Sequence, residues 1–250
     1  MKPTDSARQS SSLTDDPACL LPWDSAFFDA RIARVSVPRL HAEFIAKLLS
    51  WCSSEQIDCL YFLAPLDDVQ TIRAAEENDF RFVDIRVKLE LPLTNGVEEP
   101  KGIRTVRPVD ITPMKLLASR SFTNTRFYND AHFSRQKCDE LYSTWFERSC
   151  EGYSDCVLIA ERQSCPAGFI TCSLQNGEGV IGLLAVDQTF QGCGVGYALV
   201  AAALRYFHDH GMKRATVVTQ GGNVASQRLY QRCGFLTREV KLWYHRWRTA

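Results

Sequence analysis

A glycine-rich turn between a strand-like run and a helix-like run is the sharpest chemical signal in the sequence. The apolar residues Leu184, Ala185 and Val186 lead into it, and three glycines, the last of them Gly196, follow Gln191. Glycines remove the side chains that would keep an anion away from the backbone, and the unpaired N–H groups at a helix start carry partial positive charge. The pattern therefore predicts a turn that binds phosphate.

Three phosphate-binding patterns compete for this turn, and spacing separates them. A P-loop ends in Lys followed by Ser or Thr, but Tyr197 and Ala198 follow Gly196. The dinucleotide pattern G-x-G-x-x-G needs its third glycine where Tyr197 stands, and no parallel βαβ unit with a ribose-binding acid is evident. The third pattern, Q/R-x-x-G-x-G/A, is met by Gln191, Gly194 and Gly196.

A second signature follows at the distance expected for that third pattern. It consists of Asn223, Ala225, Ser226, Leu229, Tyr230, Cys233, Gly234 and Phe235. With both signatures in order, the chain resembles the GCN5-related N-acetyltransferase (GNAT) family from about residue 104 to residue 247. The resemblance implies an α/β (α+β) fold with a mixed central sheet that splays at the strand carrying 184–186.

The resemblance also implies acetyl-CoA as co-substrate and no metal. The implied cofactor-binding residues are Leu184, Ala185, Val186, Gln191, Gly192, Cys193, Gly194, Val195, Gly196 and Asn223. The ten cysteines form no C-x-x-C pair and no Cys/His cluster with the spacing of a zinc site. The sequence therefore also predicts no metal.

Tyr230 is the candidate catalytic acid. Acetyl transfer to an amine needs a proton for the departing thiolate, and a phenol with a pKa of about 10 is a reasonable donor to it. The alternative is that Tyr230 packs as an apolar helix residue beside Leu229. The general base stays open between Asp130 and His132, which could equally be an exposed pair in the polar loop 122–133. Ser134 is better explained as a helix cap than as a nucleophile.

Aromatic and charged residues outside the two signatures bear on the acceptor. The residues Trp23, Asp24, Ser25, Phe27 and Phe28, with Arg126, Phe127, Asp130, Phe133, Tyr142 and Trp145, resemble the dTDP-fucosamine acetyltransferase family. That resemblance implies the 4-amino group of a dTDP-linked 4-amino-4,6-dideoxyhexose as acceptor, with Arg126, Tyr128, Asp130 and His132 as candidate substrate-binding residues. An amine of a protein, peptide or polyamine is the alternative, and a non-catalytic CoA-binding module is the alternative from another class.

Charge and hydropathy restrict the partners. Lys plus Arg and Asp plus Glu number 29 each among 250 residues, so no net positive field attracts nucleic acid. The longest nearly apolar stretch, 195–207, is too short to cross a bilayer, and Arg205 interrupts it. The start of the chain lacks a signal-peptide pattern. We expect a cytoplasmic enzyme with a small-molecule amine partner; a homodimer is possible.

Periodicity predicts a smaller α/β domain at 19–95 ahead of an acetyltransferase domain at 102–250, after a disordered tail at 1–18. The predicted strands are 32–37, 57–63, 80–91, 103–107, 156–161, 167–174, 180–187, 213–219 and 235–247. The predicted helices begin near Arg39, at 65, after Thr112, after Ser134, at the glycine turn and at 223. Phe80 and Phe235 each open a strand after a helix, which is either an echo of a shared βαβ arrangement or a general feature of α/β modules.

Overall fold

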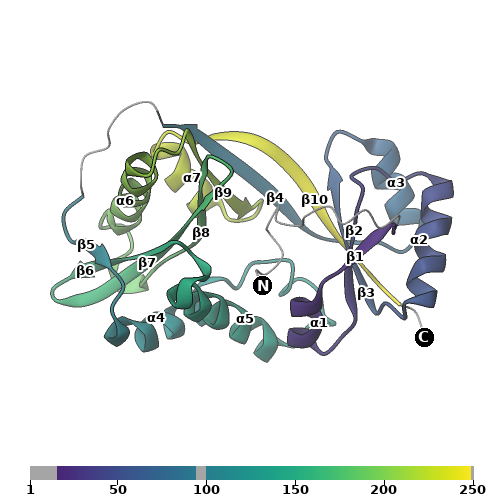
Figure 1. The fold of residues 1–250 in the computed structure, drawn as a ribbon, viewed down its shortest axis with the longest axis horizontal. Helices are drawn as coiled ribbons and strands as arrows, with labels where there is room; N and C mark the ends of the chain where they lie inside the picture. Colours follow the sequence, from purple (N-terminus) through teal and green to yellow (C-terminus); the bar gives the residue numbers. More distant parts are fainter. Residues whose placement is uncertain (1–15, 94–99, 249–250) are drawn as a thin grey trace. The chain divides into compact units, whose positions relative to one another are not determined.

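The structure is a computed structural model whose described residues are 16–93 and 100–248 (Figure 1). The strands are β1 (Ala18–Leu20), β2 (Ile32–Val35), β3 (Cys59–Pro65), β4 (Arg81–Pro92), β5 (Ile103–Thr105), β6 (Cys156–Arg162), β7 (Cys165–Gln175), β8 (Glu178–Val186), β9 (Arg214–Gln220) and β10 (Leu236–Trp247). The helices are α1 (Pro22–Phe28), α2 (Ala42–Ser54), α3 (Val69–Glu77), α4 (Pro108–Ser121), α5 (Arg135–Arg148), α6 (Val195–Asp209) and α7 (Val224–Arg232). A π-helical turn at Ser149–Tyr153 and a 3-10 turn at Gln188–Phe190 complete the elements. The predicted mixed α/β fold is confirmed.

The strands form a mixed sheet in the order β1-β2-β3-β10-β4-β9-β8-β7-β6-β5. By its contacts the chain divides into two compact units. Unit 1 holds the residues up to Arg86, Thr125–Lys137 and the residues from Val240 onward, and unit 2 holds Val87–Asn124 and Cys138–Glu239. The long strands β4 and β10 therefore each contribute residues to both units.

Unit 1 packs α2 and α3 against one face of its strands. Leu48 of α2 and Ala75 of α3 are fully buried with Phe62 of β3 and Tyr244 of β10. In this unit β10 pairs with β3 antiparallel, and β2 pairs with β3 parallel. The predicted helix starting near Arg39 is confirmed, although it begins at Ala42, where His41 Nδ1 accepts a hydrogen bond from Phe44 N. Neither β1 nor α1 was predicted.

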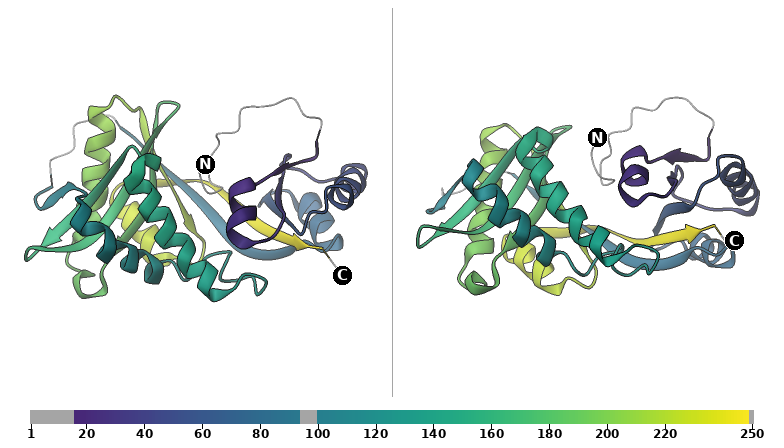
Figure 2. Two further views of the ribbon diagram at one scale, coloured as in Figure 1. Left: turned by 60° about the horizontal axis from the view of Figure 1, so that its bottom comes forward. Right: turned by 90° about the horizontal axis from the view of Figure 1, so that it is seen from below.

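Unit 2 places its strands between α6 and the pair α4 and α5 (Figures 1 and 2). The predicted meander of β6, β7 and β8 is confirmed, and Asn176 and Gly177 form its second turn with positive φ angles of 49° and 78°. Phe146 of α5 packs on Phe169 of β7, with ring centroids 4.4 Å apart. Ser134 Oγ accepts a hydrogen bond from Lys137 N, which confirms its role as the cap of α5.

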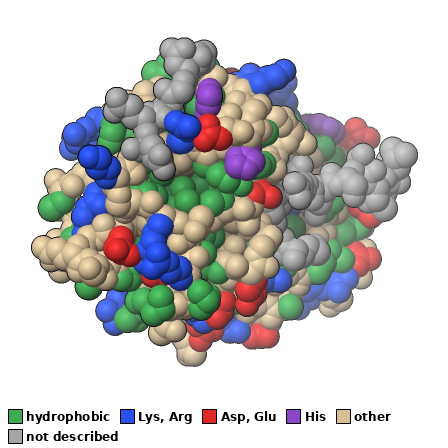
Figure 3. Space-filling view, turned by 60° about the vertical axis from the view of Figure 1, so that its left-hand side comes forward, with side chains coloured by type: hydrophobic (Ala, Val, Ile, Leu, Met, Phe, Trp, Pro, Cys, Tyr) green, Lys and Arg blue, Asp and Glu red, His purple; other side chains and the backbone are tan. Residues whose placement is uncertain are grey.

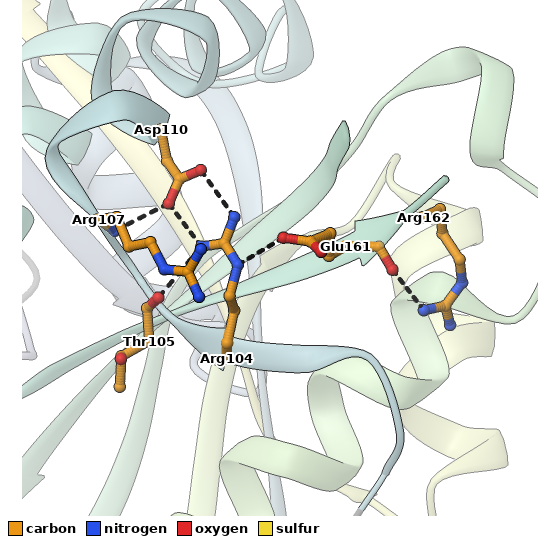
Figure 4. A network of polar contacts seen from close by, with 6 residues as sticks. All are labelled: Arg104, Thr105, Arg107, Asp110, Glu161 and Arg162. Atoms are coloured by element: carbon orange, nitrogen blue, oxygen red, sulfur yellow. Dashed lines mark hydrogen bonds and ion pairs between the residues drawn. The ribbon is translucent and has the colours of Figure 1, made fainter. Parts of the chain in front are cut away.

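The start of α4 differs from the prediction. We expected Thr112 to cap a helix whose first residue is Pro113, but α4 begins at Pro108 and Pro113 lies inside it. Asp110 fixes the earlier start, because its carboxylate accepts Arg107 N at 2.8 Å and a bidentate bond from Arg104 of β5 at 2.6 and 3.0 Å (Figure 4). Arg104 also donates to Glu161 of β6 at 2.7 Å, so one arginine connects two strands to the helix start.

The predicted domain limits relate to these units only in part. The break expected between 95 and 102 falls mainly on 94–99, outside the described residues, and most of the predicted tail does too. Ala18, its last residue, already begins β1. The units are not consecutive along the chain, because 125–137 and the end of β10 pack with the first 86 residues. Across the described part of the chain, no helix is long and apolar enough to cross a membrane.

Candidate functional site

The predicted glycine turn lies at the start of α6 in unit 2. Gly192 and Gly194 have φ angles of 77° and 78°, and a Cβ on either would meet nothing within 4 Å. Glycine is therefore required here by the backbone conformation and not by crowding. Residues 191–194 are exposed, and among the described residues the N–H groups of 192–197 have no hydrogen-bond acceptor. A run of free amides at the start of a 15-residue helix has the geometry that can bind an anion.

Gly196 joins three elements behind this turn. A Cβ at this position would lie 3.1 Å from Leu229 Cδ2 and 3.8 Å from Val186 Cγ2. The start of α6 therefore contacts both the end of β8 and helix α7. Because Tyr230 follows Leu229, this contact brings the catalytic candidate's helix against the turn.

Strand β8 separates from β9 just before the turn. The parallel pairs run from Glu178 with Arg214 to Ile181 with Val217 and stop there. The rest of β8, 182–186, pairs only with β7. This is the splay that the family resemblance implied.

The ladder with β7 determines which backbone groups face the splay. Asp187 N donates to Ala167 O at 2.9 Å, and such bonds use every second residue of an antiparallel pair. The N–H and C=O groups of Val186 and Leu184 therefore point away from β7, toward the open side. Those of Ala185 face β7, and its side chain is buried. Gln191 Nε2 donates to Val186 O at 3.1 Å, which ties the turn to the strand end.

A bulge in β8 lies where β8 stops pairing with β9. Gly182 and Leu183 together lie opposite the single residue Thr171 of β7, whose Oγ1 accepts a hydrogen bond from Leu183 N at 2.8 Å. Gly182 is required beside it, since a Cβ there would lie 2.6 Å from Thr171 Oγ1. The isolated glycine within the β8 pattern is the signal that could have found this bulge from the sequence.

Tyr230 lies in α7 and is 4% exposed. Burial raises the pKa of its phenol well above the usual value, with a smaller contribution from Cys233. Its ring packs edge-on against Phe235 at 5.7 Å, and no described residue hydrogen-bonds its hydroxyl. Asn223 caps α7, since its Oδ1 accepts Ser226 N at 3.1 Å.

The four predicted substrate-binding residues all lie in unit 1, in the segment Thr125–Lys137. Arg126 is 7% exposed, and its guanidinium carbon lies 4.1–4.3 Å from the ring centres of Tyr61, Phe127 and Trp243. Tyr128 is partly exposed, and Arg135 lies over its ring. The side chain of Arg126 is thus an interior group of unit 1.

Asp130 and His132 are not an exposed pair. The Asp130 side chain is 6% exposed, whereas that of His132 is 60% exposed. His132 Nδ1 lies 2.8 Å from Asp130 Oδ1, and the imidazole stacks on Trp247 at 4.5 Å. The four hydrogen bonds to Asp130 outweigh its burial and hold its pKa well below the usual range, so it is ionised.

Two residues of β10 complete this cluster and were missed by the sequence analysis. Asp130 Oδ2 accepts Trp247 Nε1 at 2.8 Å and lies 2.7 Å from His245 Nδ1. Arg126 lies 3.0 Å from His245 Nε2 and can only donate, so His245 is the neutral tautomer that accepts from Arg126 and donates to Asp130. No local signal links residues 115 positions apart in the chain.

The surface turned forward in Figure 3 carries acidic and basic side chains side by side rather than one extended patch of a single sign. This distribution accords with the equal numbers of acidic and basic residues in the sequence.

Part of the chain matches a known protein family. Residues 120–235 match the acetyltransferase (GNAT) family. The spore coat polysaccharide biosynthesis protein SpsD of Bacillus subtilis is 24% identical over 196 residues, which cover 77% of this chain and 68% of SpsD. A mycothiol acetyltransferase of Streptomyces avermitilis is 34% identical over 108 residues, 42% of this chain but only 33% of that protein.

A solved structure with a similar fold is the GCN5-related N-acetyltransferase from Sphaerobacter thermophilus. It has a TM-score of 0.65 at 13% identity and covers 92% of this chain and 76% of its own. GNAT enzymes use acetyl-CoA, and the free amides and the splayed strand suit its diphosphate and its amide-bearing arm. The family match shows that residues 120–235 belong to an acetyltransferase domain of the GNAT family.

Proposed function

We propose that this enzyme acetylates the 4-amino group of a nucleotide-linked amino sugar, such as a dTDP-4-amino-4,6-dideoxyhexose. Acetyl transfer from acetyl-CoA is supported by the free amides of 192–197, which follow the end of β8 that no longer pairs with β9. The similarity to SpsD supports the sugar, because SpsD is named for polysaccharide biosynthesis and the match extends well beyond the family domain.

The residues of unit 2 fit acetyl-CoA as follows. The amides from Gly192 to Gly196 and the dipole of α6 would hold the diphosphate. The outward N–H and C=O groups of Leu184 and Val186 would pair with the amides of the pantetheine arm. Asn223 keeps its capping bond and fixes the start of α7 beside that arm. When bound, acetyl-CoA supplies the acetyl group as an activated thioester.

Tyr230 would hold the proton that the departing thiolate requires. Its raised pKa keeps the phenol protonated throughout the neutral range, so it serves as an acid and not as a base. It lies in α7, the helix whose Leu229 packs on Gly196 at the start of α6.

Of the two candidate bases, the contacts favour His132. Asp130 is ionised, buried and saturated with donors, so it is a poor proton acceptor. It can instead accept from His132 Nδ1, which leaves Nε2 of an exposed imidazole able to accept a proton. Tyr128, partly exposed on the same segment, offers a ring for stacking on a sugar or base.

The experiment is thiol release from acetyl-CoA by the purified protein with a panel of amines. The panel holds dTDP-4-amino-4,6-dideoxyhexoses, UDP-amino sugars, polyamines and peptides with free N-termini. Turnover confined to nucleotide-linked 4-amino sugars is the expected result. Turnover on peptides or polyamines alone would overturn the sugar assignment and leave the transferase intact.

A further inference from the structure

Two parts of the chain repeat the same succession of elements. The elements β3, α3 and β4 span 59–65, 69–77 and 81–92, and the elements β9, α7 and β10 span 214–220, 224–232 and 236–247. Every bound in the second set lies 155 positions after its counterpart in the first. The two helices that precede these sets, α2 and α6, end at Ser54 and Asp209, again 155 positions apart.

Local geometry repeats with the same spacing. Asp68 and Asn223 each cap their helix through a bond from the residue three positions on. Asp79 and Gly234 both have positive φ, and the next residue, Phe80 or Phe235, donates its N–H to the carbonyl five positions back, at 3.1 and 3.0 Å. Matching bounds, caps and turns indicate an internal duplication. The similarity around Phe80 and Phe235 therefore extends over a whole strand–helix–strand module.

The two copies exchange their final strands. The last strand of the second copy, β10, pairs with β3 of the first copy inside unit 1. Arg248 N donates to Asp58 O at 2.8 Å, and 155 positions earlier Leu93 N donates to Lys213 O at 3.0 Å inside unit 2. Each unit is thus closed by a strand from the other copy.

The first copy lacks the part that binds the cofactor. Ile32 pairs with Cys59 as Glu178 pairs with Arg214, so the four residues of β2 correspond to the first four of β8. The counterpart of 182–186 and of the glycine turn is missing, because only 36–41 separate β2 from α2.

The place of the turn is closed by side chains of the first copy. Leu40 is 5% exposed, and its N–H donates to Thr71 Oγ1 at 3.0 Å. Arg39 pairs with Asp68, the counterpart of Asn223, at 3.4 Å. The Leu40 amide at this place therefore has a partner in its own copy, and the capping residue Asp68 is paired with a cation.

The exchanged strand β10 binds the segment 125–137 within unit 1. Trp243, His245 and Trp247 of β10 face Arg126 and Asp130 of the segment 125–137. Phe28 of α1 adds a stacked contact with Phe127 at 5.2 Å. This segment connects α4 to α5 of unit 2, yet it is fixed by unit 1.

We infer that the first copy has changed from a cofactor-binding module into a holder for the segment 125–137, with His245 as a positioning residue for acceptor binding. The inference rests on the proposed function, in which that segment carries Tyr128 and His132. His245 itself touches neither residue; it acts by joining Arg126 to Asp130, whose other oxygen orients His132.

The test compares His245→Ala with His245→Asn, whose amide N–H lies near the position of Nδ1 and can still donate to Asp130. Glu76→Gln is the matched control, because Glu76 is bonded to Tyr244, the neighbour of His245 on the opposite face of β10. His245→Ala should raise the KM for the acceptor amine at least tenfold. The Kd for acetyl-CoA, measured by calorimetry, should stay within twofold, and His245→Asn should recover most of the loss. Glu76→Gln should change neither constant.

Limited trypsin digestion provides a readout without catalysis. Cleavage after Arg126, Arg135 and Lys137 should accelerate at least tenfold in His245→Ala and not in Glu76→Gln. An unchanged KM and cleavage rate in His245→Ala would overturn the inference, as would equal weakening of acceptor and acetyl-CoA binding. If the wild type acetylates no amino sugar, the proposed function fails, and the digestion still decides whether the segment is held by His245.

Discussion

In the proposed mechanism, Tyr230 supplies the proton for the departing thiolate. Its hydroxyl has no hydrogen-bond partner among the described residues, so replacing it by hydrogen leaves the packing against Phe235 intact. Tyr230→Phe should lower kcat by about 10²–10⁴, the usual contribution of a positioned acid, and leave acetyl-CoA binding unchanged. Single-turnover kinetics and calorimetry measure the two quantities. Wild-type turnover in this variant would remove Tyr230 from the mechanism.

A second buried tyrosine makes a contrasting prediction about stability. Tyr61 Oη is buried without a hydrogen-bond partner among the described residues, whereas Tyr244 Oη donates to Glu76 at 3.1 Å. An unsatisfied buried polar group costs about 1–3 kcal/mol, and a satisfied hydrogen bond contributes about 1 kcal/mol. Tyr61→Phe should therefore keep or raise the free energy of unfolding, by about 1 kcal/mol, while Tyr244→Phe should lower it by a similar amount. Urea unfolding distinguishes them, and a clear loss in Tyr61→Phe would mean that an ordered water satisfies that hydroxyl.

At the scale of elements, β4 and β10 bring two buried groups with opposite pH dependence into unit 1. Burial, helped by the nearby Arg126, lowers the pKa of His245 to about 4 against the opposing effect of Asp130. Burial raises the pKa of Asp84 to about 6. Between pH 4 and 6 the unfolded chain protonates its histidine while folded His245 stays neutral, so this group makes stability rise with pH. In the same window folded Asp84 holds a proton that the unfolded chain has lost, so it makes stability fall as pH rises.

Substitution separates these two effects. Each group contributes a slope of up to about 1.4 kcal/mol per pH unit, and in the wild type the slopes oppose each other. Asp84→Asn removes the falling contribution, so its free energy of unfolding should rise more steeply from pH 4 to 6 than that of the wild type. His245→Asn removes the rising contribution, so its free energy of unfolding should fall over the same range relative to the wild type. Denaturant titrations at several pH values measure this. Parallel pH profiles in the two variants would contradict the assigned protonation states.

The sequence predicted those elements whose signals are local. Glycines 192 and 194 mark positive φ angles, and Asn223 is a standard cap, so the turn and α7 were predicted correctly. The start of α4 was not, because it depends on Arg104, which reaches Asp110 from another strand. The interior position of Asp130 was missed for the same reason, since its partners His245 and Trp247 come from the last strand. A polar loop in the sequence gives no sign that distant aromatic residues cover it.

At the scale of the whole chain, the duplication explains why the first and second halves differ in what they bind. Exchange of β4 and β10 makes each unit depend on a strand from the other copy. A module that needs its neighbour's last strand is not free to lose its own core, even after it has lost the cofactor turn. Unit 1 accordingly keeps a full hydrophobic core around Phe62, Phe80 and Tyr244.

One active turn and one closed turn predict a single acetyl-CoA per chain. Calorimetry should give a stoichiometry of one for the wild type. Gly194→Asp should weaken binding at least a hundredfold, because aspartate tolerates positive φ and finds open space there, but its charge repels the diphosphate. Thr71→Val, which alters the closed turn of the first copy, should leave the stoichiometry at one. A second binding event in the wild type that survives Gly194→Asp would show that the first copy still binds the cofactor.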